Sequence, residues 1–212
     1  MTHMVFLFMN HYFKSNENLE HKLIETEYVF KFAKFNFITD IGVFSKGRID
    51  FATNILLENL PELTGKTLDI GCGYGCIGIV LAKTYGENIK VIMSDVNERA
   101  LELAEKNAKK NGVSVNIIKS DGFENIHENF DNIILNPPIH AGKAVIYKIY
   151  EEAYDHLSPG GRFFIVIQKK HGALSHRQKL EEIFGNENCT VLYSKKGFFV
   201  FVFGIQGVEK FI

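Results

Sequence analysis

Short β-rich apolar runs alternate with longer segments of helical periodicity over most of the chain after residue 66. This alternation is typical of βαβ units and predicts an α/β fold built on a parallel sheet. Two further apolar runs near the end are joined by a short connection, which favours an antiparallel final pair. In chain order, the predicted strands are Thr67–Ile70, Lys90–Ser94, Val115–Ile118, Asn132–Leu135, Arg162–Ile167, Thr190–Tyr193 and Phe198–Phe203.

The segments between these runs carry the signals of helix ends. We predict helices after Gly75, Asn97, Gly142 and Ser175. The second helix has the clearest signals, because Asn97 is a good N-cap residue and Gly112 follows the last residue of the periodic segment.

The first sixty residues follow a different pattern. Between Glu27 and Thr39, aromatic and polar residues alternate on either side of a break near Ala33, which predicts a hairpin of two amphipathic strands. A glycine-rich stretch and a short helical segment, Ile55–Leu60, lead into the main pattern. We therefore expect an N-terminal extension, residues 1–60, whose hairpin caps a cleft in the main domain, residues 61–212.

Composition narrows the class of protein. The 212 residues, 46% of them apolar and 23% charged, suit one enlarged globular domain. The 24 Lys and Arg nearly balance 25 Asp and Glu, so a polyanion would have to bind a local basic patch. Three cysteines without a neighbouring His or Cys cluster argue against a disulfide framework or a metal site. The longest apolar runs, Met4–Met9 and Phe198–Ile205, fall short of the roughly 18 residues of a membrane helix, so we expect a cytoplasmic protein.

A glycine-rich turn follows the first strand of the main domain. Asp69 stands at the end of that strand, and Gly71, Gly73 and Gly75 come directly after it. This is where doubly wound sheets bind nucleotides, and the missing Cβ atoms allow a ligand to approach the backbone. A dinucleotide fingerprint would need glycine at Cys76. An acid followed by G-x-G-x-G instead resembles the first motif of class I S-adenosylmethionine-dependent methyltransferases, which implies this cofactor and a place for Asp69 near its positive charges.

Two more acidic residues lie at predicted strand ends. Asp95 ends the second strand, where an acidic side chain can accept the ribose hydroxyls. Asp121 follows the third strand, and the family resemblance implies that it accepts the exocyclic amine of the adenine. A helix N-cap for Asp95 and an ordinary turn acid for Asp121 are the alternatives.

The fourth strand ends in Asn136, Pro137 and Pro138. The prolines fix their own φ and favour an extended Asn136, so that its amide and the adjacent backbone carbonyl can point together into the crevice. Two acceptors so placed can hold both hydrogens of a planar NH₂ group, and positioning of this kind can contribute about 7 to 11 kcal/mol. Neither a metal nor a covalent nucleophile is needed. A merely rigid turn is the alternative.

Taken together, these motifs resemble methyltransferases that act on exocyclic or amide nitrogens of adenine, cytosine, guanine or glutamine. The stretches TDIGVFSKGRID, NPPIHAGK, VIQKKHGA and KKGFFVF further resemble the small-subunit ribosomal RNA guanine-N2 methyltransferases of the RsmC type, particularly short single-domain bacterial relatives. The resemblance implies a Rossmann-like, seven-stranded sheet with an antiparallel last strand, a guanine amine as target, and ribosomal RNA or the small ribosomal subunit as partner. It begins near His11, so Met9 is an alternative start of translation.

Three alternatives stay open beside this interpretation. The first is a glutamine-amide methyltransferase that acts on a protein such as a release factor. The second is an adenine N6 methyltransferase. The third is a cofactor-binding ribosome assembly factor without turnover.

One departure from the amino-methyltransferase pattern concerns the target base. The residue after N-P-P is Ile139 rather than an aromatic residue that could stack on a flipped base. We expect Ile139 still to contact the substrate, and Phe44, or failing that Phe198 or Phe199, to supply the stacking.

The expected RNA contacts lie late in the chain. From residue 136 onward, 10 basic and 7 acidic residues give a local balance of +3. His140, Lys169 and Lys170 are the candidate contacts to base or phosphate, and phosphate contacts would position the RNA without reading its sequence.

Overall fold

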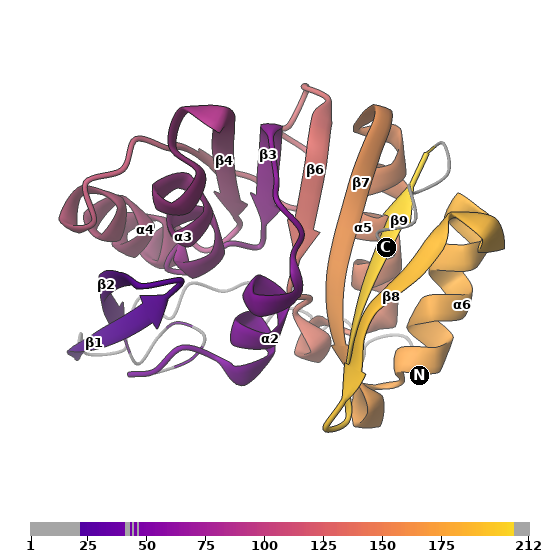
Figure 1. The fold of residues 1–212 in the computed structure, drawn as a ribbon, viewed down its shortest axis with the longest axis horizontal. Coiled ribbons are helices and arrows are strands. Elements are labelled where there is room, and N and C mark those ends of the chain that lie inside the picture. The colour runs from indigo at the N-terminus through magenta and orange to yellow at the C-terminus, as the bar shows by residue number, and fades with distance from the viewer. Residues whose placement is uncertain (1–21, 41–42, 44, 46, 206–212) are drawn as a thin grey trace, which may run out of the picture.

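A seven-stranded sheet with the order β5-β4-β3-β6-β7-β9-β8 forms the centre of the computed structural model (Figure 1). Its strands are β3 (Gly65–Ile70), β4 (Ile89–Asp95), β5 (Asn116–Lys119), β6 (Phe130–Leu135), β7 (Leu157–Gln168), β8 (Cys189–Lys195) and β9 (Phe198–Gly204). Strand β9 runs antiparallel to both of its neighbours, β7 and β8, and all other strand pairs of the sheet are parallel. The predicted fold class is therefore confirmed. The structure describes residues 22–40, 43, 45 and 47–205, so Phe44 and Met9 lie outside it.

Helices cover both faces of the sheet (Figure 1). They are α2 (Phe51–Asn59), α3 (Cys76–Tyr85), α4 (Glu98–Lys110), α5 (Lys143–Asp155) and α6 (Ala173–Phe184), with single turns at Gly86–Asn88, Ile139–Ala141, Lys169–His171 and Asn186–Asn188. The expected N-cap of α4 is confirmed, since the Asn97 side chain accepts a hydrogen bond from Arg99 N. Helix α6 starts two residues before the predicted Ser175, directly after Gly172 in the left-handed conformation. No helix in the described part of the chain is long and apolar enough to cross a membrane.

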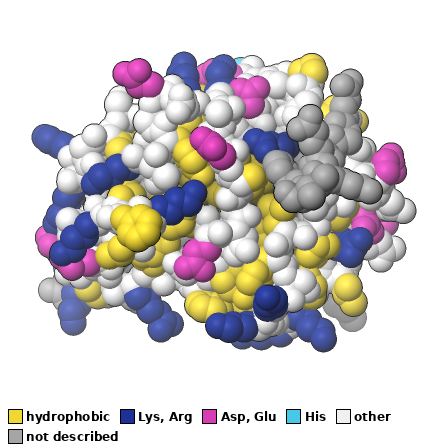
Figure 2. Space-filling model, viewed as in Figure 1, with side chains coloured by type: hydrophobic (Ala, Val, Ile, Leu, Met, Phe, Trp, Pro, Cys, Tyr) yellow, Lys and Arg dark blue, Asp and Glu magenta, His cyan; other side chains and the backbone are white. Residues whose placement is uncertain are grey.

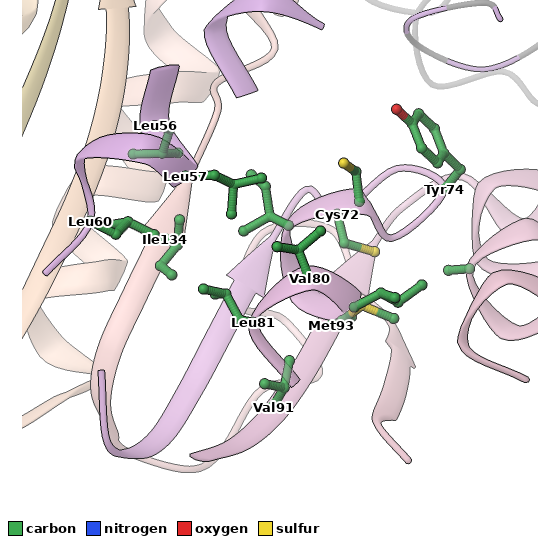
Figure 3. Packing of buried hydrophobic residues seen from close by; sticks show 14 of the residues in the cluster. Leu56, Leu57, Leu60, Cys72, Tyr74, Val80, Leu81, Val91, Met93 and Ile134 are labelled. Atoms are coloured by element: carbon green, nitrogen blue, oxygen red, sulfur yellow. The ribbon is translucent and has the colours of Figure 1, made fainter. Parts of the chain in front are cut away.

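The core consists of two clusters, one on each face of the sheet. One cluster joins α2, α3 and α4 to the sheet, and the other lies under α5 and α6. Figure 3 shows Leu60, directly after α2, beside Ile134 of β6, with Leu57 of α2 above them. All three side chains are buried, so α2 is held firmly against the sheet beside the carboxyl end of β6.

Strands β1 (Leu23–Phe30) and β2 (Ala33–Asp40) form the predicted hairpin. The aromatic alternation places Phe32 in the first strand, and this detail is wrong. Phe30 pairs with Ala33, so the turn consists of Lys31 and Phe32, at φ 44° and 69°, and the Phe32 side chain is fully exposed. Positive φ at both positions is the type I′ geometry, whose twist matches that of the two strands, so the backbone sets the turn here despite the aromatic side chain.

Two asparagines, Asn107 of α4 and Asn111 at its C-cap, attach the hairpin to the rest of the molecule. Asn107 Oδ1 accepts from Ile38 N at 2.7 Å, and Asn107 Nδ2 donates to Ile38 O at 2.9 Å. Asn111 forms the same two bonds with Asn36, at 3.0 and 2.8 Å. Asn107 and Asn111 are one helical turn apart, so their amides reach alternate residues of β2. They pair with the backbone N–H and C=O groups at the outer edge of β2, as a neighbouring strand would.

The hairpin and the main domain share a core. Phe35 and Phe37 of β2 are fully buried in the cluster that also contains residues of α3 and α4. The cavity described below is bordered by α2 and by residues just before it, whereas β2 packs against α3 and α4. A boundary at residue 60 and a capping role for the hairpin stay predictions.

Candidate active site

The carboxyl ends of the central strands surround a cavity of about 480 Å³. Parallel strands bring the residues that follow them to one edge of the sheet, and this edge is open in doubly wound folds. Five residues that the sequence singled out line this cavity together: Gly71, Gly73, Asp95, Asp121 and Asn136. They lie as far apart as 65 positions in the chain, so their convergence supports one common site.

The glycine turn leaves room for a ligand at two of its glycines. Gly71 and Gly73 have φ values of 70° and 57°, and a Cβ at either position would meet nothing within 4 Å. Gly75 differs, because a Cβ there would lie 2.9 Å from Ile79 Cδ1. The first two glycines therefore expose backbone to the cavity. The third lacks a Cβ that would clash with the Ile79 side chain at the start of α3.

Asp69 lies beneath the turn and is only 1% exposed. Its Oδ2 accepts a 2.8 Å hydrogen bond from Gly78 N in the first turn of α3, where Gly75 offers no side-chain cap. Its Oδ1 has no partner among the described residues, and burial raises its pKa from 3.8 to about 7. Asp69 is not among the residues that line the cavity. Its contact with the methionine part of a cofactor stays a prediction.

The raised pKa makes stability depend on pH. Between about pH 4 and pH 7 the folded chain binds one proton more at Asp69 than the unfolded chain, in which the carboxyl has its ordinary pKa of 3.8. The free energy of unfolding should therefore fall as pH rises through this window, by up to about 1.4 kcal/mol per pH unit. We expect Asp69→Asn, which can still accept from Gly78 N, to remove this contribution in urea titrations of the cofactor-free protein. Equal slopes for both proteins would contradict this assignment.

Asp95, the last residue of β4, is hydrogen-bonded to the glycine turn. Its Oδ2 accepts from Gly73 N and its Oδ1 from Asn97 N, both at 2.8 Å. Burial raises its pKa, and these two backbone bonds oppose the shift. The helix N-cap is Asn97, so Asp95 keeps acceptor capacity toward the cavity. Binding of ribose hydroxyls there stays a prediction.

Asp121 is exposed at the cavity, in a turn that Ser120 organises. Ser120 Oγ donates to Gly122 O at 2.9 Å and accepts from Asn125 N at 3.0 Å. Ser120 itself is buried, whereas Asp121 lines the cavity. The turn therefore presents the Asp121 carboxylate to a ligand, and its bond to adenine stays a prediction.

Two residues at the start of α2, which the sequence analysis missed, hold the amide of Asn136. Asn136 Nδ2 donates to Thr53 Oγ1 at 2.9 Å and to Asp50 Oδ2 at 3.2 Å. The same Asp50 oxygen caps α2 by accepting from Thr53 N at 3.0 Å. With Nδ2 engaged, Oδ1 is the amide atom available to accept a hydrogen bond in the cavity. The predicted helix, Ile55–Leu60, starts four residues later than α2, so Asp50 did not stand at its N-cap position.

The N-P-P loop turns sharply after Asn136. Pro137 is buried, and the carbonyl of Pro138 accepts from Ala141 N at 2.9 Å, which closes the turn Ile139–Ala141. Ile139 and His140 both line the cavity. The loop therefore places the two predicted substrate contacts directly beside the asparagine.

The remaining predicted substrate contacts are spread around the mouth. Lys169 and Lys170 are exposed and border a neighbouring depression rather than the main cavity. His171, which the sequence analysis did not select, lines the cavity, and its pKa is lowered by partial burial and by the charges of Lys170 and His140. Phe198 lines the cavity, whereas Phe199 packs against the cluster on the other face.

The thiols beside the glycine turn do not supply a nucleophile. Cys72 and Cys76 are buried, and burial raises the pKa of both groups, so they are protonated at neutral pH. The site instead offers open backbone, carboxylates and one fixed amide. Such an arrangement can bind and orient two reactants, which suits a direct transfer between them.

Comparison with known proteins identifies the family. A model of the methyltransferase small domain matches residues 34–202, most of the chain. The chain belongs to the methyltransferase small-domain family. The class I, S-adenosylmethionine-dependent methyltransferase relationship that the motifs suggested is thereby confirmed.

The relatives of this small-domain methyltransferase differ in length. It is 40% identical over 195 residues to the uncharacterized protein YbxB of Bacillus subtilis, covering 90% of the present chain and 96% of that protein. It is 41% identical over 133 residues to ribosomal RNA small subunit methyltransferase C of Hahella chejuensis, which is 60% of the present chain. The match covers 39% of the Hahella protein, so the chain corresponds to less than half of this named relative.

Solved structures agree with this assignment. The RsmC 16S rRNA N2 G1207 methyltransferase of Thermus thermophilus, solved with AdoMet and guanosine, matches with a TM-score of 0.76 and 28% identity. The match covers 86% of the small-domain methyltransferase and 50% of the Thermus chain. A methyltransferase from Pyrococcus furiosus, 21% identical with a TM-score of 0.64, covers 98% of both chains and supports the fold alone.

Proposed function

We propose that this methyltransferase acts on an exocyclic amino nitrogen, and that this nitrogen is N2 of guanine in small-subunit ribosomal RNA. The observation that carries the proposal is the fixed amide of Asn136, whose Nδ2 is held by Asp50 and Thr53. The guanine assignment is supported by similarity to RsmC proteins, one of which was solved with guanosine.

The residues around the cavity fit S-adenosylmethionine. The open backbone at Gly71 and Gly73 leaves space for its methionine part, and the carboxylates of Asp95 and Asp121 face the same cavity as acceptors for hydroxyl and amino groups. The cavity, at about 480 Å³, lies within the range of small-molecule sites. When bound, the cofactor supplies a methyl group on a positively charged sulfur. A neutral nitrogen can take this methyl group, and the sulfur leaves as a neutral thioether.

In this proposal, the chain's own residues orient the attacking nitrogen. Asn136 Oδ1 and the carbonyl of Pro137 accept the two hydrogens of the amine, which directs the nitrogen lone pair at the methyl carbon. Pro137 and Pro138 keep this pair of acceptors rigid because their φ angles are fixed. The amine becomes acidic only once it carries the methyl group, so its proton can leave to water and we assign no general base.

The proposed partner is RNA held at the mouth of the cavity. His140 and His171 line the cavity, and Lys169 and Lys170 are exposed next to it. The two lysines suit phosphates on either side of a base that enters the cavity.

The test is transfer of labelled methyl from S-adenosylmethionine to small ribosomal subunits from a strain that lacks this gene. We expect label in N2-methylguanosine after digestion of the RNA, and none with Asn136→Ala. Label in N6-methyladenosine or in protein glutamine would support methyltransferase activity but reject guanine as the target. RNA binding that rescues subunit assembly without any transfer would reject catalysis.

A further inference from the structure

Two phenylalanines that are distant in sequence form an aromatic pair at the mouth of the cavity. The rings of Phe51, at the start of α2, and Phe198, at the start of β9, have centroids 5.3 Å apart and cross at 72°. Phe51 is 51% exposed, and Phe198 is partly buried and lines the cavity. We call this pair the aromatic rim.

Phe198 of the aromatic rim and Asn136 line the same cavity. Phe51 follows Asp50, whose carboxylate accepts from Asn136 Nδ2. Phe198 pairs across the sheet with Gln168, which ends β7 and also lines the cavity. A planar group held by Asn136 would therefore occupy the cavity that Phe198 also lines.

Phe198 and Ile139 belong to opposite sides of the cavity. Phe198 packs with the cluster on the face of α2 and α3, whereas Ile139 packs with the cluster under α5 and α6. Asn136, at the end of a central strand, lies between these two faces. A base that enters between them would have an aliphatic side chain on one side and an aromatic ring on the other.

The surroundings of the aromatic rim suit a nucleic acid. Figure 2 shows hydrophobic side chains gathered at the lower edge of the molecule, below α2, with Lys and Arg side chains around them. Lys169 and Lys170, after β7, and Lys195 and Lys196, before β9, are all exposed. Aromatic rings bordered by cations are the arrangement that binds a stacked base and its flanking phosphates.

We propose that Phe198, supported edge-on by Phe51, is the stacking surface for the target base, in place of the aromatic residue that N-P-P lacks here. This proposal rests on the proposed function, because it takes the planar group to be a nucleobase. Stacking on an aromatic ring strengthens base binding by about 10- to 100-fold. Phe198 is thus a substrate-binding residue, and Phe51 is a positioning residue that fixes its ring.

The absence of tryptophan from the chain gives a direct measurement. Phe198→Trp introduces one fluorescent indole at the proposed stacking surface, and Phe199→Trp places the same ring at the neighbouring position on the other face. With S-adenosylhomocysteine saturating the cofactor site, we expect guanosine monophosphate and substrate RNA to quench the fluorescence of Phe198→Trp and to leave that of Phe199→Trp unchanged. Equal responses of the two variants, or none, would overturn the proposal.

Kinetics provide the second test and a check on folding. Phe198→Ala should raise KM for RNA about 10-fold or more with a smaller change in kcat, and Phe198→Tyr should restore KM. Phe51→Ala should raise KM less, since it acts through Phe198. RNA methylation with unchanged KM in Phe198→Ala would reject the stacking role and leave the proposed function standing. Quenching in Phe198→Trp without methylation of any RNA by the unmodified protein would reject the proposed function instead.

Discussion

Replacing Asn136 with alanine should reduce methyl transfer by about 10³-fold or more, while affinity for S-adenosylmethionine changes by no more than a few fold. The variant loses the Oδ1 acceptor, and with it most of the orientation that such a pair of acceptors provides. Cofactor binding depends mainly on other parts of the cavity, namely Gly71, Gly73, Asp95 and Asp121. The measurement is single-turnover transfer together with calorimetric titration of the cofactor.

The controls separate this effect from a loss of structure. Asn186→Ala removes an exposed asparagine from the turn after α6, well outside the cavity, and should keep full activity. Asn136→Asp keeps the size of the side chain but places a second carboxylate against Asp50, so it should also be nearly inactive. Normal turnover in Asn136→Ala would refute the assigned role.

The second large effect should come from the two residues that hold Asn136. Thr53→Val removes only the hydroxyl that accepts from Asn136 Nδ2, and Asp50→Ala removes the other acceptor. We expect each to lower kcat about 10- to 100-fold, with little change in cofactor affinity, because the amide can then rotate away from the productive geometry. Steady-state kinetics and thermal unfolding of each variant are the measurements.

Conservative variants distinguish positioning from helix capping. Asp50→Ala also removes the N-cap of α2, which costs about 1 kcal/mol of stability. Asp50→Asn still offers an oxygen to both Thr53 N and Asn136 Nδ2, and Thr53→Ser keeps the hydroxyl, so both should retain most activity. If Thr53→Val turned over at the normal rate, α2 would be only a structural support.

Local chain order was sufficient to predict that several motif residues meet at one edge of the sheet. The glycine turn, Asp95, Asp121 and Asn136 each lie at the end of a predicted strand or just after it, and the carboxyl ends of parallel strands meet at one edge. The type of fold and the edge at which the cavity lies could therefore be predicted from motifs a few residues long. The antiparallel last strand followed in the same way from the short connection before Phe198.

Other features depend on contacts that no local pattern encodes. The bonds from Asn136 to Thr53 and Asp50 span 83 and 86 positions, and Phe51 meets Phe198 from the other end of the chain. A polar residue before a helix predicts a cap, and an aromatic residue in a strand predicts packing. Neither pattern specifies which distant residue the side chain will contact.

The sequence by itself thus determined the strands, the cofactor turn and the N-P-P loop, because backbone preferences and residue order act over a few positions. Only the tertiary structure decided that Asp69 lies beneath the turn rather than on the cavity wall, and that Asp50 and Thr53 hold the amide of Asn136. The direction of a side chain within the folded molecule depends on packing between distant elements, and each element alone is compatible with several such packings.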